Sequence, residues 1–413
     1  MIFLKLLAMA FLVMAEADNK PVPYHISVDP KLIDQAATKA QFYRPSLGLE
    51  DGTSDTWREG PPAENMTALA QYWANDYNWL EVQKGMNANG HHYIVNVSAG
   101  YGYNQPLPIH FVHEQSERPD AIPLLMLHGW PSTHTEWNEI LKPLTSPEDA
   151  GAPAFHVVAP DMPGFGFSPA PTHRGFGSRQ AGAAFANLMK TLGYDKYGII
   201  STDAGWWIAM FMADDDKEHL VGHFTDFYFA QPTPADTERF SKNQTDQIES
   251  EYMAGLLAFD SGFSAYMTIQ SQNPLKLSQA LNDSPVGFAG WIWHMIHAIS
   301  DGYPFTPEQI VTRTLLIWIP GAYGNVRSYL EWLKPESMKF PQSDVPTGVA
   351  QWGNVNGPFK ELAKLPLAPR SWIERLSNLT FLNTRDFGGH FPAEHHPKLY
   401  VKDVQDFFSQ LNA

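Results

Sequence analysis

Short apolar segments that alternate with helical stretches constrain the fold of this chain more strongly than any other feature. Helical patterns at residues 136–145 and 179–193 separate the apolar segments 122–127, 156–160 and 197–201. Strands that are separated by helices form a mostly parallel sheet that is buried on both faces. In such sheets, catalytic groups gather at the carboxyl ends of the strands. We therefore expect an α/β fold with its functional site at that edge of the sheet.

The rest of the chain is predicted to consist of segments attached to, or inserted in, one α/β domain. The length of 413 residues is long for one compact domain, and no internal repeat is visible. A helix expected at 66–79 would place Leu69, Tyr72 and Trp73 on one packing face. The predicted parts are an N-terminal extension (22–105), a first core part (106–231), an aromatic-rich helical cap (232–340) and a second core part (341–413) with a last strand at 379–382 and a closing helix at 401–411.

Composition excludes several classes of function. The net charge of −16 argues against a nucleic-acid partner, since polyphosphates are bound by basic surfaces. Hydrophobic residues make up 44% of the chain and charged residues only 17%, which indicates a globular protein. The chain has no cysteine, so disulfides, thiolate metal sites and cysteine nucleophiles are all excluded.

The N-terminus has the order of features of a secretory signal. Lys5 precedes an apolar run at residues 6–14, and the triplet Ala15-Glu16-Ala17 supplies the small residues of a cleavage site. The run is too short to span a bilayer, so residues 1–17 are predicted to be a signal peptide, with a membrane-surface N-terminus as the alternative. A secreted glycoprotein is therefore expected, with candidate N-glycosylation sites at Asn65, Asn96, Asn243 and Asn378.

The strongest local signal is Ser201-Thr202-Asp203-Ala204-Gly205, which lies between an apolar strand and a helical run. A nucleophile elbow has small residues on both sides of the nucleophile, because its sharp turn leaves no room for large ones. The central residue is Asp203, so the predicted nucleophile is a carboxylate and Ser201 is a turn residue. Taken alone, Asp203 could equally be the N-cap of the following helix.

The loop His128-Gly129-Trp130-Pro131 follows an apolar strand, where an α/β-hydrolase fold places one amide of its oxyanion hole. We expect the backbone N–H groups of Trp130 and Ala204 to bind the oxyanion of an ester intermediate. His128 is interpreted as a structural residue of this loop, and the glycine-bearing turn at 160–168 as structural support.

A second loop, Gly388-Gly389-His390, follows the last predicted strand. Two glycines allow a tight loop to aim the imidazole of His390 at the nucleophile. The chain order of nucleophile, acid and histidine then matches the α/β-hydrolase fold, with His390 as general base. His395 and His396 are less favoured because they lie in the polar stretch that begins the closing helix.

With these motifs in place, the sequence resembles the microsomal-type epoxide hydrolases, including the fungal members and the insect juvenile-hormone enzymes, over nearly its whole length. The resemblance rests on Tyr72-Trp73, Tyr77-Asn78-Trp79, Ile109-His110-Phe111-Val112-His113, the loops at 128–131 and 388–391, Asp203, and the segment 281–287.

The resemblance implies a two-step hydrolysis that needs no metal or organic cofactor. A small lipophilic epoxide would form an ester with Asp203, and a water activated by His390 would release a vicinal diol. The resemblance also implies two cap tyrosines that hold the epoxide oxygen, and these match Tyr266 and Tyr329. A phenol can polarise that oxygen and donate a proton to the developing alkoxide.

The acid that should orient His390 is the point where the sequence departs from the family. An ungapped alignment places Lys364 there, and a lysine cannot stabilise an imidazolium. Alignment on Pro358-Phe359-Lys360-Glu361 selects Glu361, which we take as the orienting acid, because Asp344 precedes the strand expected at 345–349. The alternative is that the acid is missing or relocated, which would slow ester hydrolysis more than ester formation.

Three other functions compete with an epoxide hydrolase. A haloalkane dehalogenase shares the Asp nucleophile but typically has a tryptophan N–H beside it, where this chain has Ala204. A biosynthetic cyclase would open the epoxide with a hydroxyl of the substrate itself. A non-catalytic binding protein on the same fold would not need Asp203.

Overall fold

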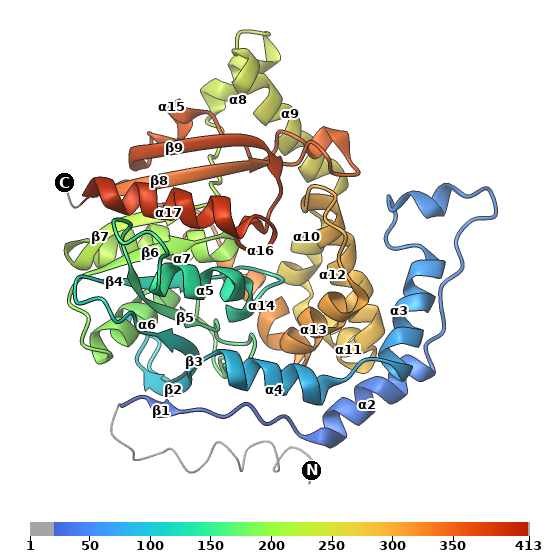
Figure 1. Ribbon diagram of the computed structural model, residues 1–413. Coiled ribbons are helices and arrows are strands. Elements are labelled where there is room, and N and C mark those ends of the chain that lie inside the picture. Colours follow the sequence, from blue (N-terminus) through green and yellow to red (C-terminus); the bar gives the residue numbers. More distant parts are fainter. Residues whose placement is uncertain (1–19, 412–413) are drawn as a thin grey trace.

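A computed structural model describes residues 20–411, so the predicted signal peptide lies outside the described residues. Its centre is one nine-stranded sheet with the strand order β1-β2-β3-β5-β4-β6-β7-β8-β9 (Figure 1). The strands are β1 (Val22–Pro23), β2 (His92–Val97), β3 (Leu107–Glu114), β4 (Ile122–Leu127), β5 (Phe155–Pro160), β6 (Tyr197–Ser201), β7 (Leu220–Thr225), β8 (Ser343–Gly353) and β9 (Ser377–Gly388).

The sheet is parallel from β5 to β9 and antiparallel at the edge that β1, β2 and β3 form. The parallel strands β4 and β6 have the bounds expected from the apolar segments 122–127 and 197–201. The predicted mostly parallel α/β architecture is therefore confirmed.

Helices cover both faces of the parallel strands. Successive side chains of a strand point to opposite faces, so an all-apolar strand needs a packing partner on each face. Along β4, Leu124 and Met126 belong to one core cluster, and Leu125 and Leu127 belong to the other. The first face carries α5 (Asn138–Thr145) and α17 (Pro397–Leu411), and the second carries α6 (Ser178–Thr191) and α7 (Asp203–Asp215).

The closing helix α17 approaches the sheet so closely that glycine is needed beneath it. A Cβ at Gly198 would lie 2.5 Å from the ring of Phe408, and a Cβ at Gly348 would lie 2.6 Å from the ring of Phe407. Both rings are fully buried, and burial of such a side chain contributes about 1.5–3 kcal/mol.

A helical cap is inserted between β7 and β8, beside the carboxyl ends of the strands (Figure 1). The backbone N–H of His390 donates to the carbonyl of Ile299, at the end of a cap helix, over 2.9 Å, which ties the cap to the loop after β9. The cap helices are α8 (Pro234–Ser241), α9 (Gln247–Gly262), α10 (Ala265–Gln272), α11 (Pro274–Asp283), α12 (Pro285–Ile299), α13 (Pro307–Trp318) and α14 (Ala322–Trp332). The loop segment that follows β8 contains the short helix α15 (Arg370–Ile373), and α16 (Pro392–His395) precedes α17.

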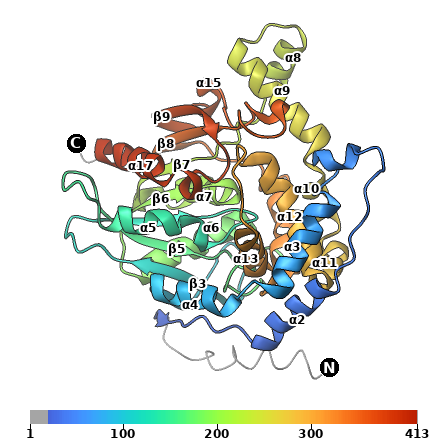
Figure 2. The same cartoon turned by 45° about the vertical axis from the view of Figure 1, so that its right-hand side comes forward.

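The N-terminal extension runs from the sheet edge to the outer side of the cap, as Figure 2 shows. Its helices are α2 (Pro30–Gln41), α3 (Ala63–Asn75) and α4 (Trp79–Asn89). The hydroxyl of Tyr77 lies 2.9 Å from that of Thr312 on α13, and Lys39 forms a 2.7 Å ion pair with Asp283 on α11. Among residues 20–411, no helix has both the length and the apolar character that crossing a membrane requires.

The single helix expected at 66–79 is wrong, because α3 ends at Asn75 and α4 begins at Trp79. The side chain of Asn78 accepts hydrogen bonds from the N–H groups of Leu80 and Glu81, so it caps a new helix. The packing role expected for Leu69 and Trp73 is confirmed, since both side chains are buried.

Candidate active site

Asp203 is the first residue of α7 and adopts the left-handed region of backbone space, with φ of 44°. A non-glycine residue rarely has this conformation, and it persists only where the surroundings impose it. A Cβ at Gly205 would lie 2.2 Å from the carbonyl oxygen of Leu127, and a Cβ at Gly129 would lie 2.3 Å from the Cβ of Asp203. Glycine at both positions is what lets the strand, the turn and the helix meet this tightly.

The two carboxylate oxygens of Asp203 have different surroundings. Oδ1 accepts a 2.9 Å hydrogen bond from the backbone N–H of Trp130. The N–H groups in the first turn of a helix, here including that of Ala204, have no partner within the helix and favour negative charge. Oδ2 lies 3.8 Å from Nε2 of His390. One oxygen is therefore held at the predicted oxyanion site while the other faces the predicted base.

His128 supports the oxyanion loop and does not reach the carboxylate. Its Nδ1 donates to the carbonyl of Gly129 at 2.9 Å, and its Nε2 accepts from the N–H of Met162 at 3.0 Å. This bonding pattern requires a neutral ring, and burial lowers the pKa of His128 to about 4. The expected structural role of His128 agrees with these contacts.

His390 is aimed by a loop in which Gly388 and Gly389 both have positive φ, of 113° and 70°. A Cβ at Gly389 would lie 2.7 Å from the carbonyl carbon of Ser300, so the loop fits against the end of the cap only with glycine there. Burial lowers the pKa of His390, although the negative charge of Asp203 opposes the shift. The imidazole is therefore neutral near pH 7 and can accept a proton from water.

Tyr266 on α10 and Tyr329 on α14 bring two phenols over the oxyanion loop. Their ring centroids are 5.7 Å apart, and the indole of Trp130 stacks on Tyr266 at 5.1 Å and meets Tyr329 edge-on at 5.8 Å. Burial raises the pKa of both phenols, and the charge of Asp203 raises it further. Both hydroxyls consequently stay protonated at any physiological pH.

The structure does not bring Glu361 to His390, which contradicts the assignment of Glu361 as the orienting acid. Glu361 lies on the 3₁₀ helix η5 (Lys360–Leu362), and its partly exposed carboxylate pairs with Arg58. The residue directly after β8 is Asn354, whose amide bonds to the N–H of Asp301 and to the carbonyl of Ala298. Within residues 20–411, no hydrogen bond or ion pair joins Glu361 to His390, and its carboxylate is already paired with Arg58.

Sequence reasoning missed two buried carboxylates on the sheet side of Asp203. Asp226 directly follows Thr225, the last residue of β7, and Glu136 lies on the 3₁₀ helix η3 (His134–Trp137) behind the oxyanion loop. Both side chains are buried. An acidic residue directly after an apolar strand next to the elbow strand is the signal that could have identified Asp226.

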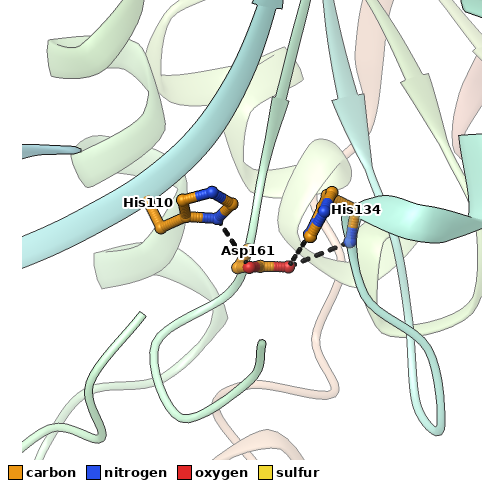
Figure 3. A group of neighbouring side chains, drawn as sticks. All are labelled: His110, His134 and Asp161. Atoms are coloured by element: carbon orange, nitrogen blue, oxygen red, sulfur yellow. Dashed lines mark hydrogen bonds and ion pairs between the residues drawn. The ribbon is translucent and has the colours of Figure 1, made fainter. Parts of the chain in front are cut away.

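One group within residues 20–411 has the spacing of metal ligands, namely His110, His134 and Asp161 (Figure 3). Nδ1 of His110 lies 2.7 Å from one oxygen of Asp161, and Nδ1 of His134 lies 2.8 Å from the other. Each oxygen of Asp161 also accepts one 2.9 Å hydrogen bond from a backbone N–H. Oδ1 accepts from His134 and Oδ2 accepts from Phe167. The donor atoms face the carboxylate and not a common centre.

This buried cluster holds the turn at 160–168 in place. Burial alone would raise the pKa of Asp161, but His134 and His110 hold it well below its usual range. Nδ1 of His92 on β2 lies 3.0 Å from Nε2 of His110, so the cluster connects the N-terminal extension to the loop after β5. It therefore explains the supporting role expected for the turn at 160–168.

Four features together define an enzyme of the α/β-hydrolase fold. They are the strand β6, the strained elbow with Asp203 at its tip, the oxyanion loop and the histidine loop. Residues 21–137 match the family described as "Epoxide hydrolase N terminus", and residues 122–225 match the family described as "alpha/beta hydrolase fold". A protein of Stigmatella aurantiaca named "Putative epoxide hydrolase" is 30% identical over 88% of this chain and 80% of its own length. The chain therefore belongs to the microsomal-type epoxide hydrolase family.

Two further relatives extend the similarity to the whole molecule. The juvenile hormone epoxide hydrolase of Manduca sexta is 27% identical over 94% of this chain and 86% of that protein. The solved structure of the Aspergillus niger epoxide hydrolase superposes with a TM-score of 0.80 at 25% identity, covering 95% of this chain and 97% of the other. The sequence-based identification of the family is thus confirmed.

Proposed function

We propose that this enzyme hydrolyses a small lipophilic epoxide to a vicinal diol through a covalent ester on Asp203. The observation that carries the proposal is the asymmetric environment of one carboxylate. Oδ1 of Asp203 is held by the N–H of Trp130, and Oδ2 faces His390 at 3.8 Å. Two protonated phenols complete the site, since Tyr266 and Tyr329 both contact the ring of Trp130.

In the first step, Oδ2 of Asp203 attacks one carbon of the epoxide and the bond from that carbon to the ring oxygen breaks. The oxygen takes a proton from Tyr266 or Tyr329, so a neutral hydroxyalkyl ester forms and the tyrosinate regains its proton from solvent. The raised pKa keeps each phenol protonated and ready to donate, and the developing alkoxide is a strong enough base to take that proton. Oδ1 becomes the ester carbonyl and stays in the oxyanion hole.

In the second step, His390 takes a proton from a water whose oxygen attacks the carbonyl carbon of the Asp203 ester. The N–H groups of Trp130 and Ala204 stabilise the resulting oxyanion. When the intermediate collapses, the bond between the ester oxygen and the carbonyl carbon breaks, and the leaving alkoxide takes the proton from His390. The diol then departs, and the carboxyl group of Asp203 loses its proton to solvent, which balances the proton that the tyrosinate took up. The regenerated carboxylate holds one oxygen from water.

The aromatic side chains around the site support a lipophilic substrate. Trp130 and Tyr329 lie near Asp203, and the rings of Phe227 and Phe391 contact the imidazole of His390 edge-on. The Manduca sexta relative is named for juvenile hormone. A flat or elongated apolar epoxide would fill such surroundings better than a polar one.

A biosynthetic cyclase is a second candidate, and one observation favours it. No carboxylate within residues 20–411 makes a hydrogen bond to the ring of His390, which weakens activation of water relative to formation of the ester. In a cyclase, a hydroxyl of the substrate attacks the activated epoxide and no water is consumed. A dehalogenase is less favoured, because the residue after the nucleophile is Ala204 and provides no indole N–H for a halide.

Single turnover in oxygen-18 water tests the mechanism. With enzyme in excess over an apolar epoxide such as styrene oxide, we expect the label to enter the peptide that carries Asp203, while the first diol contains only the unlabelled oxygens. Mass spectrometry of the peptide and of the product measures both. Label that appears in the first diol and never in Asp203 would overturn the covalent mechanism. With an apolar epoxide that also carries a hydroxyl, a cyclic ether with the mass of the substrate would identify a cyclase.

We also propose that the chain enters the secretory pathway and is glycosylated. Asn65 and Asn243 are exposed, which supports modification, whereas Asn96 is half-buried in β2 and the amide of Asn378 donates to the carbonyl of Asp344. Glycosylation is therefore expected first at Asn65 and Asn243, and the mass lost on enzymatic removal of N-glycans from secreted protein measures it. Unmodified asparagines at both positions would contradict the proposal.

A further inference from the structure

The carboxylate of Asp226 is buried near Asp203, and the hydroxyls of Thr202 and Tyr400 approach it without reaching good hydrogen-bond geometry. A buried carboxylate that lacks well-aligned partners is costly, and native structures nearly always avoid it. A carboxyl group that gains and loses a proton during a reaction would explain this exception.

The surroundings of Asp226 contain further polar groups whose partners are missing. The hydroxyls of Thr202 and Tyr400 lie near enough to Asp226 to lower its pKa, but both are buried and neither is in good hydrogen-bond geometry with any group. Glu136 contributes two more unpaired oxygens, and its pKa is raised well above its usual range by burial and by Asp226. The shift favours the protonated, uncharged form of Glu136.

The sheet order places Asp226 between the nucleophile and the base. β7 lies between β6, which leads to Asp203, and β8 and β9, which lead to His390. The next residue, Phe227, sets its ring edge-on to the imidazole of His390, with centroids 5.9 Å apart. Asp226 is also near enough to Asp203 for the two charges to repel.

The usual place for an orienting acid, directly after β8, is occupied by Asn354, whose amide is already bonded to the end of the cap. Arg313, whose charge acts on Glu136 and His390, is paired with Glu394 at 2.5 Å. Within residues 20–411, Asp226 therefore forms no ion pair, and the residue directly after β8 is not an acid.

We propose that Asp226 is the positioning acid of His390, reached from the end of β7 and not from the end of β8. This inference rests on the proposed ester mechanism. When His390 takes a proton from the attacking water, ionised Asp226 stabilises the imidazolium and keeps Nε2 directed at the ester. This role requires the carboxylate or the imidazole to rotate during the second step until the two groups meet.

The protonation state of Asp226 sets the direction of the pH dependence. Burial raises the pKa of Asp226 to about 7, and the charge of Asp203 contributes in the same direction. Below that pH, Asp226 is neutral and cannot stabilise an imidazolium, so ester hydrolysis slows as the pH falls. Protonation of His390 slows ester hydrolysis only at a lower pH, because burial holds the pKa of this imidazole below its usual value.

The test separates the two chemical steps in Asp226→Asn by rapid mixing of enzyme with styrene oxide. We expect ester formation at close to the wild-type rate and ester hydrolysis slower by about a hundredfold or more, by analogy with loss of an orienting carboxylate elsewhere. In wild type, the hydrolysis rate should fall about tenfold for each pH unit below about 7, and this limb should vanish in the variant.

The matched control is Glu361→Gln, which removes the charge of a partly exposed carboxylate paired with Arg58 and should leave both steps unchanged. The wild-type pH profile needs no variant, so a poorly folded Asp226→Asn would not prevent the test. Wild-type ester hydrolysis at constant rate between pH 5 and 9, or normal hydrolysis by Asp226→Asn, overturns the inference. If wild type forms no ester at all, the proposed function fails instead.

Discussion

Replacement of His390 by glutamine is expected to stop the enzyme after one epoxide per site has reacted. The first step needs only Asp203 and the phenols, so the ester still forms. The second step loses its base, and a water near a neutral ester attacks slowly without one. We expect steady-state turnover to fall by about 10³-fold or more, within the range that removal of a general base causes.

Intact-protein mass spectrometry measures this outcome as a gain of one substrate mass that persists for many wild-type turnovers. The matched control is His396→Gln, since His396 lies six positions further on and stacks on Trp352 at 5.8 Å, away from Asp203. The control should turn over without accumulating ester. A His390→Gln enzyme that releases diol at the wild-type rate would show that another group is the base.

The reaction centre could be predicted from sequence where the chemistry forces a local pattern. The elbow at Asp203 needs small neighbours, because the gap between Gly205 and the carbonyl of Leu127 excludes even a methyl group. The loop before His390 needs glycines for its positive φ values. Such steric requirements appear directly in the sequence, and the structure brings these residues together as expected.

The orienting acid could not be predicted, because its place depends on the path of a loop. Alignment selects Glu361 by its neighbours in sequence, but the turn after β8 begins at Asn354 and carries Glu361 to a surface ion pair with Arg58. The only sign of Asp226 in the sequence is its place directly after an apolar strand. The sheet order, which sets β7 between the strands of Asp203 and His390, is needed to show that it lies between these two residues.

The N-terminal extension shows the same limit at the level of helices. The apolar positions of 66–79 suit one continuous helix, and periodicity alone cannot detect the break after Asn75. The break is set by the capping side chain of Asn78 and by the contact of Tyr77 with α13 of the cap. Tertiary contacts and a cap therefore override the helical pattern.

Replacement of both cap tyrosines by phenylalanine is expected to slow ester formation by about 10⁴-fold or more, and each single replacement by about 10- to 100-fold. Without a phenol, the epoxide oxygen must leave as an unassisted alkoxide in a buried site, where an unpaired charge is strongly disfavoured. One remaining phenol still supplies a proton, so the effects of the two residues should not simply add.

In the double variant, ester formation should become the slow step, so no ester accumulates. This is the opposite of the result expected for His390→Gln, in which ester hydrolysis is the slow step. Rapid mixing under single-turnover conditions measures it. Tyr77→Phe is a suitable control, since it removes a phenol that bonds to Thr312 outside the site. In wild type, ester formation should stay constant well into the alkaline range, because burial raises the pKa of Tyr266 and Tyr329. A loss of ester formation between pH 7 and about 9 would mean that a more acidic group than either phenol protonates the epoxide oxygen.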